Sequence, residues 1–169
     1  MQIGRLLRHC AATHWRTRMK FPRAALDAIE QAIARAEQRH AGEIRFAVET
    51  ALTPMHILNG VAPRVRALEV FAHLGVWDTE HNNGVLIYVQ LADRNVEIVA
   101  DRGFAGRVSS AEWEAVCRLM EAHYRAGRFR EGSIAGVDAI GDLLSRHFPQ
   151  NTEAGAQSRN QLPDRPTLL

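Results

Sequence analysis

The feature that most constrains the fold is a nearly continuous apolar run over Val85–Leu91, in which only Gln90 is strongly polar. Strands that are buried on both faces of a sheet have this composition. A short polar break, Ala92–Asn95, separates the run from a second β-branched run, Val96–Ala100. Two such runs with a four-residue connection predict an antiparallel hairpin, with Val85–Leu91 as a central strand.

A crossover unit is predicted before the hairpin. Residues Glu43–Glu49 alternate polar and apolar side chains, which predicts a strand with one buried face. After a long loop over Thr50–Gly60, a helix opens at Pro63 and stops at Gly75. A strand, a helix and a second strand form a right-handed βαβ unit with parallel strands. Parallel and antiparallel neighbours around Val85–Leu91 make a small mixed β-sheet, and the fold class is α/β.

Apolar periodicity predicts three more helices in a domain over residues 21–149. One begins near Pro22 and ends by Gly42, one is capped by Ser109 or Ser110 and ends at Gly127, and one runs from about Arg130 to Arg146. The following tail, residues 150–169, is polar and is expected to lie on the surface or to be disordered. Within it, Asn160–Asp164 could dock as a short extended segment.

The first 20 residues contain five basic side chains and no acidic one. A helical stripe is formed by Ile3, Leu6, Leu7, Cys10, Ala11 and His14. A basic amphipathic helix of this kind packs on its own domain with a solvated basic face, makes a peripheral contact with an anionic membrane, or binds a partner. The composition also fits an organelle transit peptide.

Composition narrows the function classes. A net charge of +2 gives no argument for nucleic-acid binding. The two cysteines, Cys10 and Cys117, form no disulfide framework and are expected to be small core residues. No apolar run reaches the roughly 20 residues of a membrane span. These features predict a soluble protein in the reducing cytoplasm.

The loops at one edge of the predicted sheet are rich in polar side chains. Pairing of the strands brings the start of Glu43–Glu49, the start of Val85–Leu91 and the end of the hairpin to that edge. The candidate site residues there are Glu43, Asp78, Glu80, Asn83, Asp101 and Arg102. Carboxylate and amide oxygens are hard ligands that suit Ca²⁺ or Mg²⁺. The alternative is loop structure alone, in which Asp78 caps the loop, Asn83 takes an unusual backbone angle and Asp101 pairs with Arg102.

Motifs for other chemistries are missing from the sequence. There is no His-Glu-x-x-His helix, no Gly-x-Ser-x-Gly turn and no glycine-rich nucleotide loop. An acyl-transfer or nucleotide-hydrolysing enzyme is therefore not expected, and neither is a nucleotide or organic cofactor.

Three stretches resemble the signature of the TPM domain family: Trp77-Asp78-Thr79, Asn82–Tyr88 and Val99–Gly103. The similarity extends over roughly residues 21–149. It implies an α/β/α sandwich, with helices on both faces of the sheet, and an acidic cleft that holds divalent cations. Part of the family is credited with acid phosphatase activity, and other members resemble accessory proteins for the assembly, repair or modulation of membrane complexes.

Many members of the family carry a signal peptide, a membrane anchor and a glycine-rich tail, and this sequence shows none of them. The function expected is a cytoplasmic accessory protein with an unidentified, membrane-associated protein partner and a divalent-cation site at Asp78, Asp101, Asn83 and Glu43. The first alternative is a metal-dependent phosphomonoesterase in which Arg102 clamps the phosphate. The sequence identifies no nucleophile or general acid for it. The second alternative is a membrane adaptor that uses residues 1–20.

Overall fold

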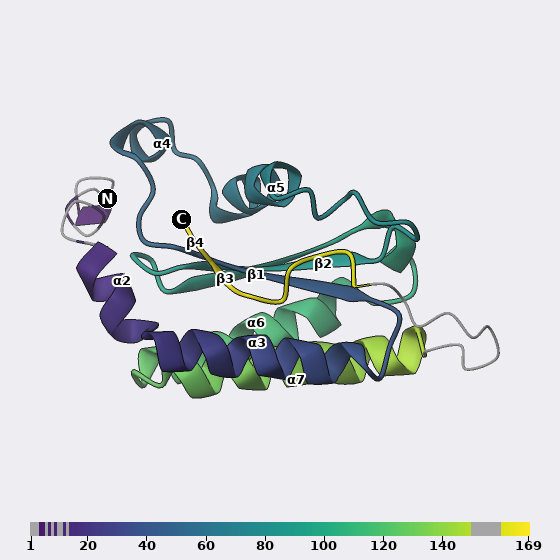
Figure 1. Cartoon of the computed structure of the whole chain (residues 1–169). Coiled ribbons are helices and arrows are strands. Elements are labelled where there is room, and N and C mark those ends of the chain that lie inside the picture. The colour runs from purple at the N-terminus through teal and green to yellow at the C-terminus, as the bar shows by residue number, and fades with distance from the viewer. Residues whose placement is uncertain (1–3, 6, 8, 10–11, 13, 150–159) are drawn as a thin grey trace.

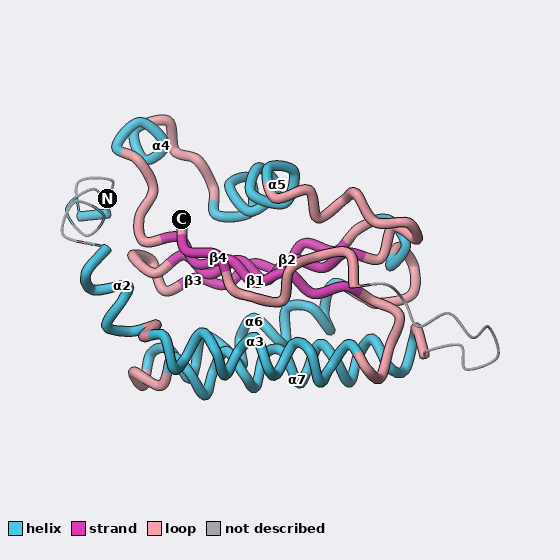
Figure 2. The backbone as a smooth tube through the Cα atoms, viewed as in Figure 1, coloured by secondary structure: helices cyan, strands magenta, loops and turns pink. Residues whose placement is uncertain are grey.

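A mixed sheet with the strand order β3-β2-β1-β4 forms the centre of the computed structural model (Figure 1). The structure describes residues 4–5, 7, 9, 12, 14–149 and 160–169. The strands are β1 (Glu43–Glu49), β2 (Gly84–Gln90), β3 (Asn95–Ala100) and β4 (Thr167–Leu168). Figure 2 shows the sheet between two layers of helix, with α3, α6 and α7 on one face and α5 on the other. The predicted α/β architecture is confirmed.

The predicted central strand is also confirmed. β2 pairs in parallel with β1, from Glu43↔Gly84 to Glu49↔Gln90, and antiparallel with β3. Alternate side chains of β2 therefore face opposite layers. Val85, Ile87 and Val89 join the core under α3, α6 and α7. Leu86 and Tyr88 join a smaller core under α5.

Four long helices follow the start and stop signals of the sequence. α3 (Arg23–Glu37) begins directly after Pro22, and α5 (Pro63–His73) has its proline in the first turn. α6 (Ser110–Arg125) starts with a reciprocal capping box between Ser109 and Glu112. α7 (Phe129–His147) packs against both α3 and α6. Within the described part of the chain, no helix has the length and apolarity needed to cross a bilayer.

Two elements of the βαβ unit differ from the sequence prediction. All residues of β1 are buried, so the expectation of one buried face was wrong. Its polar face is covered by α5 and by the C-terminal segment, which supply partners for Glu43, Arg45 and Glu49. The loop expected over Thr50–Gly60 contains a short helix, α4 (Pro54–Leu58), because the Thr53 hydroxyl accepts a hydrogen bond from the His56 amide and caps it.

The two ends of the chain are described in part. Residues His14–Lys20 form α2, whose buried residue is Thr17. The predicted stripe members Ile3, Leu6, Cys10 and Ala11 lie outside the described residues, as do residues 150–159.

Residues 160–169, in contrast, are docked on the sheet rather than loose on the surface. Leu162 is buried, and β4 pairs in parallel with β1 at Ala47↔Thr167 and Val48↔Leu168. The expectation of an undocked tail is therefore wrong for these residues. Docking, the alternative raised for Asn160–Asp164, is what the structure shows.

Candidate functional site

Three loops meet at Gly84, the first residue of β2. The Gly84 carbonyl accepts a hydrogen bond from the Asp101 amide at 2.9 Å. A Cβ atom on Gly84 would overlap the carbonyl oxygen of Val76, so the segment that leads to Asp78 passes directly over this glycine. The carbonyl of Asn83 accepts from the Glu43 amide at 3.0 Å. The backbone therefore brings the predicted polar loops to one edge of the sheet.

A left-handed residue shapes the turn before β2. Asn82 has φ 52°, whereas the sequence analysis placed the unusual backbone angle at Asn83. Asparagine tolerates this region because its short side chain bonds locally. The Asn82 carbonyl accepts from the Gly103 amide at 3.0 Å, and its side-chain oxygen accepts from Arg102 Nε at 2.8 Å. A Cβ atom on Gly103 would overlap the Asn82 carbonyl, so the two loops are in close contact.

Two buried oxygen atoms at this edge have no hydrogen-bond partner among the described residues. Asp101 Oδ1 accepts from the Arg102 amide at 2.7 Å and caps the short 3-10 helix η1 (Arg102–Phe104), whereas Oδ2 has no partner. The Asn83 side chain donates from Nδ2 to the Ala41 carbonyl, and its Oδ1 also has no partner. An unsatisfied buried acceptor costs about 1–3 kcal/mol unless a donor or a cation meets it.

The other predicted acidic residues are placed differently. Asp78 is exposed, and its amide donates to the Gly75 carbonyl at 2.9 Å. Glu80 is also exposed, and its amide donates to the side chain of Gln161. Glu43 is buried, and its carboxylate accepts from the amides of Gln161 at 3.1 Å and Leu162 at 3.3 Å. Glu43 therefore holds the C-terminal segment, a role that the sequence analysis did not foresee.

Arg102 does not neutralise Asp101 directly. Its guanidinium group bonds to Asn82, and the described residues contain no ion pair between Arg102 and a carboxylate. Asp101 and Arg102 instead share the wall of a cavity of about 200 Å³ at the outer side of β3. The remaining wall includes Arg64, Phe104, Val108 and Trp113. Both guanidinium groups of this wall have hydrogen-bond partners, since Arg64 donates to the Ile98 carbonyl and Arg102 donates to Asn82.

Sequence periodicity missed one acidic residue near this edge. Glu37 of α3 accepts a hydrogen bond from the Ile44 amide at 2.7 Å. Burial raises the pKa of Glu37 to about 8, against the lowering effect of that bond, and the charges of Glu43 and Asp164 raise it further. No group of three or more His, Cys, Asp or Glu side chains converges in the described ranges. A cation here would need amide, main-chain and water oxygens as well.

The chain is similar to one known protein family and to two solved structures. The model of the TPM domain matches residues 21–143. BA42, from the psychrophilic bacterium Bizionia argentinensis, is 28% identical and has a TM-score of 0.73 over 86% of this chain and 92% of its own. The N-terminal domain of a P. gingivalis protein has the same fold, with 23% identity and a TM-score of 0.54 over 72% of this chain and 76% of its own. No curated protein matches the chain.

Proposed function

Because the chain belongs to the TPM domain family, we propose that it is an accessory binding protein whose working part is a divalent-cation site at the Gly84 edge. The observation that carries the proposal is Asp101 Oδ2, a buried carboxylate oxygen without a hydrogen-bond partner among the described residues. A bound cation would satisfy such an oxygen. Asn83 Oδ1, buried and unpartnered at the same edge, supports the same assignment.

The proposed ligands are Asp101, Asn83 and Asp78, completed by main-chain carbonyls and water. All are hard oxygen donors: Asp78 and Asn83 lie in the loop before β2, and Asp101 lies in the loop after β3. Ca²⁺ accepts six to eight such oxygens in irregular geometry, whereas Mg²⁺ requires a near-ideal octahedron. The donor set therefore favours Ca²⁺. Glu43 adds negative charge next to the site, with its own carboxylate bonded to the C-terminal segment.

The charge balance of the edge supports a cation over neutralisation by arginine. Asp101 Oδ2 is a buried carboxylate oxygen with no hydrogen-bond partner among the described residues. Arg102 is the nearest candidate in the sequence, but its guanidinium group bonds to the amide of Asn82. A bound cation would instead give Asp101 Oδ2 a positive partner.

A phosphatase is the second candidate, and the cavity beside Asp101 favours it. Arg64 and Arg102 line that cavity and are suited to hold the oxygens of a phosphate ester. A metal held by Asp101 would polarise the phosphoryl oxygen or activate a water molecule. The described lining contains no serine, cysteine or histidine that would serve as a nucleophile. The described residues therefore support a binding function more than a phosphatase.

Thermal unfolding in the presence of cations tests the proposal. Ca²⁺ should raise the melting temperature of the wild type, by the equivalent of about 2.7 kcal/mol at 100 times the dissociation constant. Asp101→Asn should abolish the shift. Asp138→Asn is the matched control, because it removes the same charge from an exposed position on α7. If millimolar Ca²⁺, Mg²⁺ and Mn²⁺ leave the wild-type curve unmoved, the cation site is wrong.

An assay with a generic phosphate ester separates the two candidates. An accessory protein shows no turnover with or without the cations. Cation-dependent hydrolysis that Asp101→Asn removes, and that Asp138→Asn leaves intact, would make the phosphatase the correct function.

A further inference from the structure

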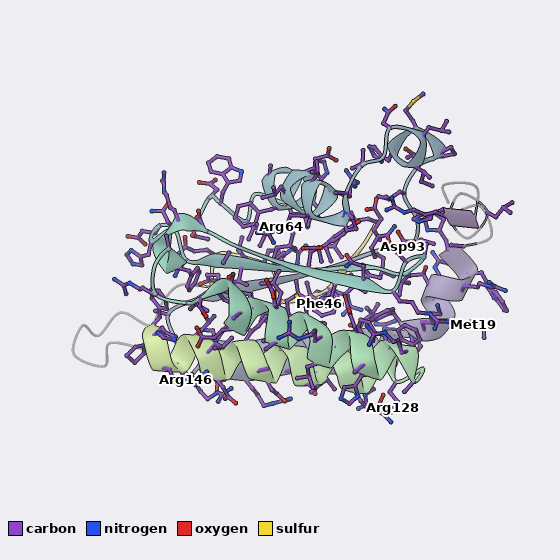
Figure 3. All side chains as sticks on the ribbon, turned by 180° about the vertical axis from the view of Figure 1, so that it is seen from behind. Met19, Phe46, Arg64, Asp93, Arg128 and Arg146 are labelled. Atoms are coloured by element: carbon purple, nitrogen blue, oxygen red, sulfur yellow. The ribbon has the colours of Figure 1, made fainter. Side chains whose placement is uncertain are left out.

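Four of the five most exposed large apolar side chains of the described residues lie on two helices at one end of the molecule. Trp15 and Met19 of α2 are 67% and 61% exposed, and Met55 and Leu58 of α4 are 63% and 61% exposed. Figure 1 shows α2 and α4 at the same end, and Figure 3 shows Met19 there, directed away from the sheet. Burying these four side chains would require a surface outside the described chain.

The exposed apolar residues of α2 lie on one side of the helix. Thr17 is its buried residue and bonds to the hydroxyl of Thr50 at 2.8 Å. At about 100° per residue, Trp15 and Met19 lie on the side of the helix opposite Thr17. Arg16 and Arg18, both exposed, flank this pair at about 80° on either side. The helix therefore presents two apolar side chains with one arginine on either side of them.

The short helix α4 repeats the arrangement. Its buried residue is Ile57, and Met55 lies nearly opposite at the same angular spacing. Leu58 follows Met55 by about one turn, so the two lie on neighbouring parts of the outer surface. The Thr53 cap and Pro54 in the first turn fix this helix at its start. Exposure of Met55 and Leu58 is thus a consequence of an ordered local structure.

The charge of this end is mainly positive. The sequence contains no acidic residue before Asp27 and none between Glu49 and Glu69, which covers both helices. Asp93, an acid near this end, contacts Arg5 at 2.8 Å and His9 at 3.3 Å. Arg16 and Arg18 have no ion-pair partner in the described ranges. The pKa of Lys20 is lowered by burial and by the charges of Arg94 and Arg16, as expected where cations cluster.

We propose that this end of the molecule, formed by α2 and α4, docks on an anionic phospholipid bilayer. Trp15, Met19, Met55 and Leu58 enter the interface, and Arg16 and Arg18 contact the lipid phosphates. Unpaired cations around apolar side chains complement a surface that is negative outside and apolar inside. A protein surface would have to supply separate carboxylates for these arginines. This docking is independent of the cation site at Gly84.

Flotation of the full chain with vesicles tests the proposal. The protein should bind phosphatidylcholine vesicles that contain phosphatidylserine and not vesicles of phosphatidylcholine alone. The double change Arg16→Gln with Arg18→Gln should weaken binding about thirtyfold, since each basic residue near the surface contributes about 1 kcal/mol. Trp15→Ala with Met19→Ala should also weaken it, by at least about tenfold. Val65→Ala with Leu68→Ala is the control, because it removes exposed apolar surface from α5.

Fluorescence locates the contact without relying on a loss of binding. The variant Trp77→Phe with Trp113→Phe leaves Trp15 as its one tryptophan, since the chain has three. Anionic vesicles should shift its emission to the blue, and brominated acyl chains should quench it. No binding to the anionic vesicles at low salt, equal loss of binding in the α5 control, or unchanged Trp15 emission would overturn the proposal. This end would then be assigned to a protein partner.

Discussion

Arg102 donates a hydrogen bond from Nε to the side-chain oxygen of Asn82 at 2.8 Å. The bond joins the turn before β2 to the 3-10 helix after β3, which are the two loops beside the proposed cation ligands Asn83 and Asp101. It also orients the Arg102 guanidinium toward an amide rather than a carboxylate. The position of one asparagine therefore affects both the shape and the charge of this edge.

Two substitutions of Asn82 should separate its backbone role from its side-chain role. Asn82→Gly keeps the left-handed conformation and loses the bond to Arg102, at a cost of about 0.5–1.5 kcal/mol. Asn82→Ala should be less stable than Asn82→Gly by about 1 kcal/mol, because alanine adopts φ 52° with difficulty. Urea unfolding measures both. Equal stability of the two variants would show that the backbone angle carries no cost.

Docking of the C-terminal segment should depend on one leucine more than on another. Leu162 is 6% exposed and packs with Val70, Val76 and Leu86, whereas Leu168 is 38% exposed. Leu162→Ala should lower the free energy of unfolding by about 2–4 kcal/mol, because it leaves a cavity under α5. Leu168→Ala should cost less than about 1 kcal/mol. Chemical denaturation provides the comparison, and similar losses would mean that the segment is not anchored at Leu162.

A buried carboxylate fixes α5 on the sheet. Glu49 accepts from Arg66 Nε and Nη2 at 3.0 Å, and also from the hydroxyl of Tyr88. Glu49→Gln should destabilise the fold by about 2–3 kcal/mol, since it leaves the Arg66 charge without its buried partner. Glu69→Gln removes the exposed partner of Arg66 and should cost about 0–1 kcal/mol. A larger loss for Glu69→Gln would contradict this assignment.

The stability of the protein should respond to pH through Glu37. Folding raises the pKa of this carboxyl from 4.5 to about 8, chiefly by burial, so the folded state retains a proton that the unfolded state releases. The contribution of Glu37 to the free energy of unfolding is complete below pH 4.5 and is lost as the pH rises to about 8. Glu37→Gln keeps an acceptor for the Ile44 amide and cannot titrate.

The test is the difference in unfolding free energy between wild type and Glu37→Gln, measured at a series of pH values. Other titrating groups cancel in this difference. The wild type should lose stability relative to Glu37→Gln between about pH 4.5 and 8, and the difference should stay constant above that range. A difference that is flat across the range would mean that Glu37 ionises normally in the folded state.

The sheet could be predicted from sequence where the signal was local. The run Val85–Leu91 is apolar because β2 is covered on both faces, and the hairpin to β3 follows from the short polar connection. The alternation of β1 was misleading, because polar strand residues usually face solvent. Here Arg45 donates to the carbonyls of Pro163 and Arg165, and nothing near Arg45 in sequence indicates those partners.

For the candidate site, the sequence predicts which loops lie together but not which side chains contact each other. Strand pairing alone brings Asn83 and Asp101 to one edge, and the register confirms that edge. The commitment of Glu43 to the C-terminal segment depends on tertiary docking of a stretch with no periodic pattern. The left-handed angle fell one residue earlier than expected, because either asparagine of the Asn82-Asn83 pair can adopt it.

The pairing of β4 with β1 has a consequence for the order of folding. Arg45 and its partner Pro163 are 118 residues apart, and the ladder at this edge contains only two residue pairs. Closing so long a loop has an entropy cost. The contacts of this short ladder offset that cost only after β1 and β2 are already paired. The C-terminal segment should therefore close last and open first, through a partial unfolding that leaves the rest of the sheet intact. Hydrogen exchange at the Leu169 amide, which donates to the Val48 carbonyl, reports this opening directly.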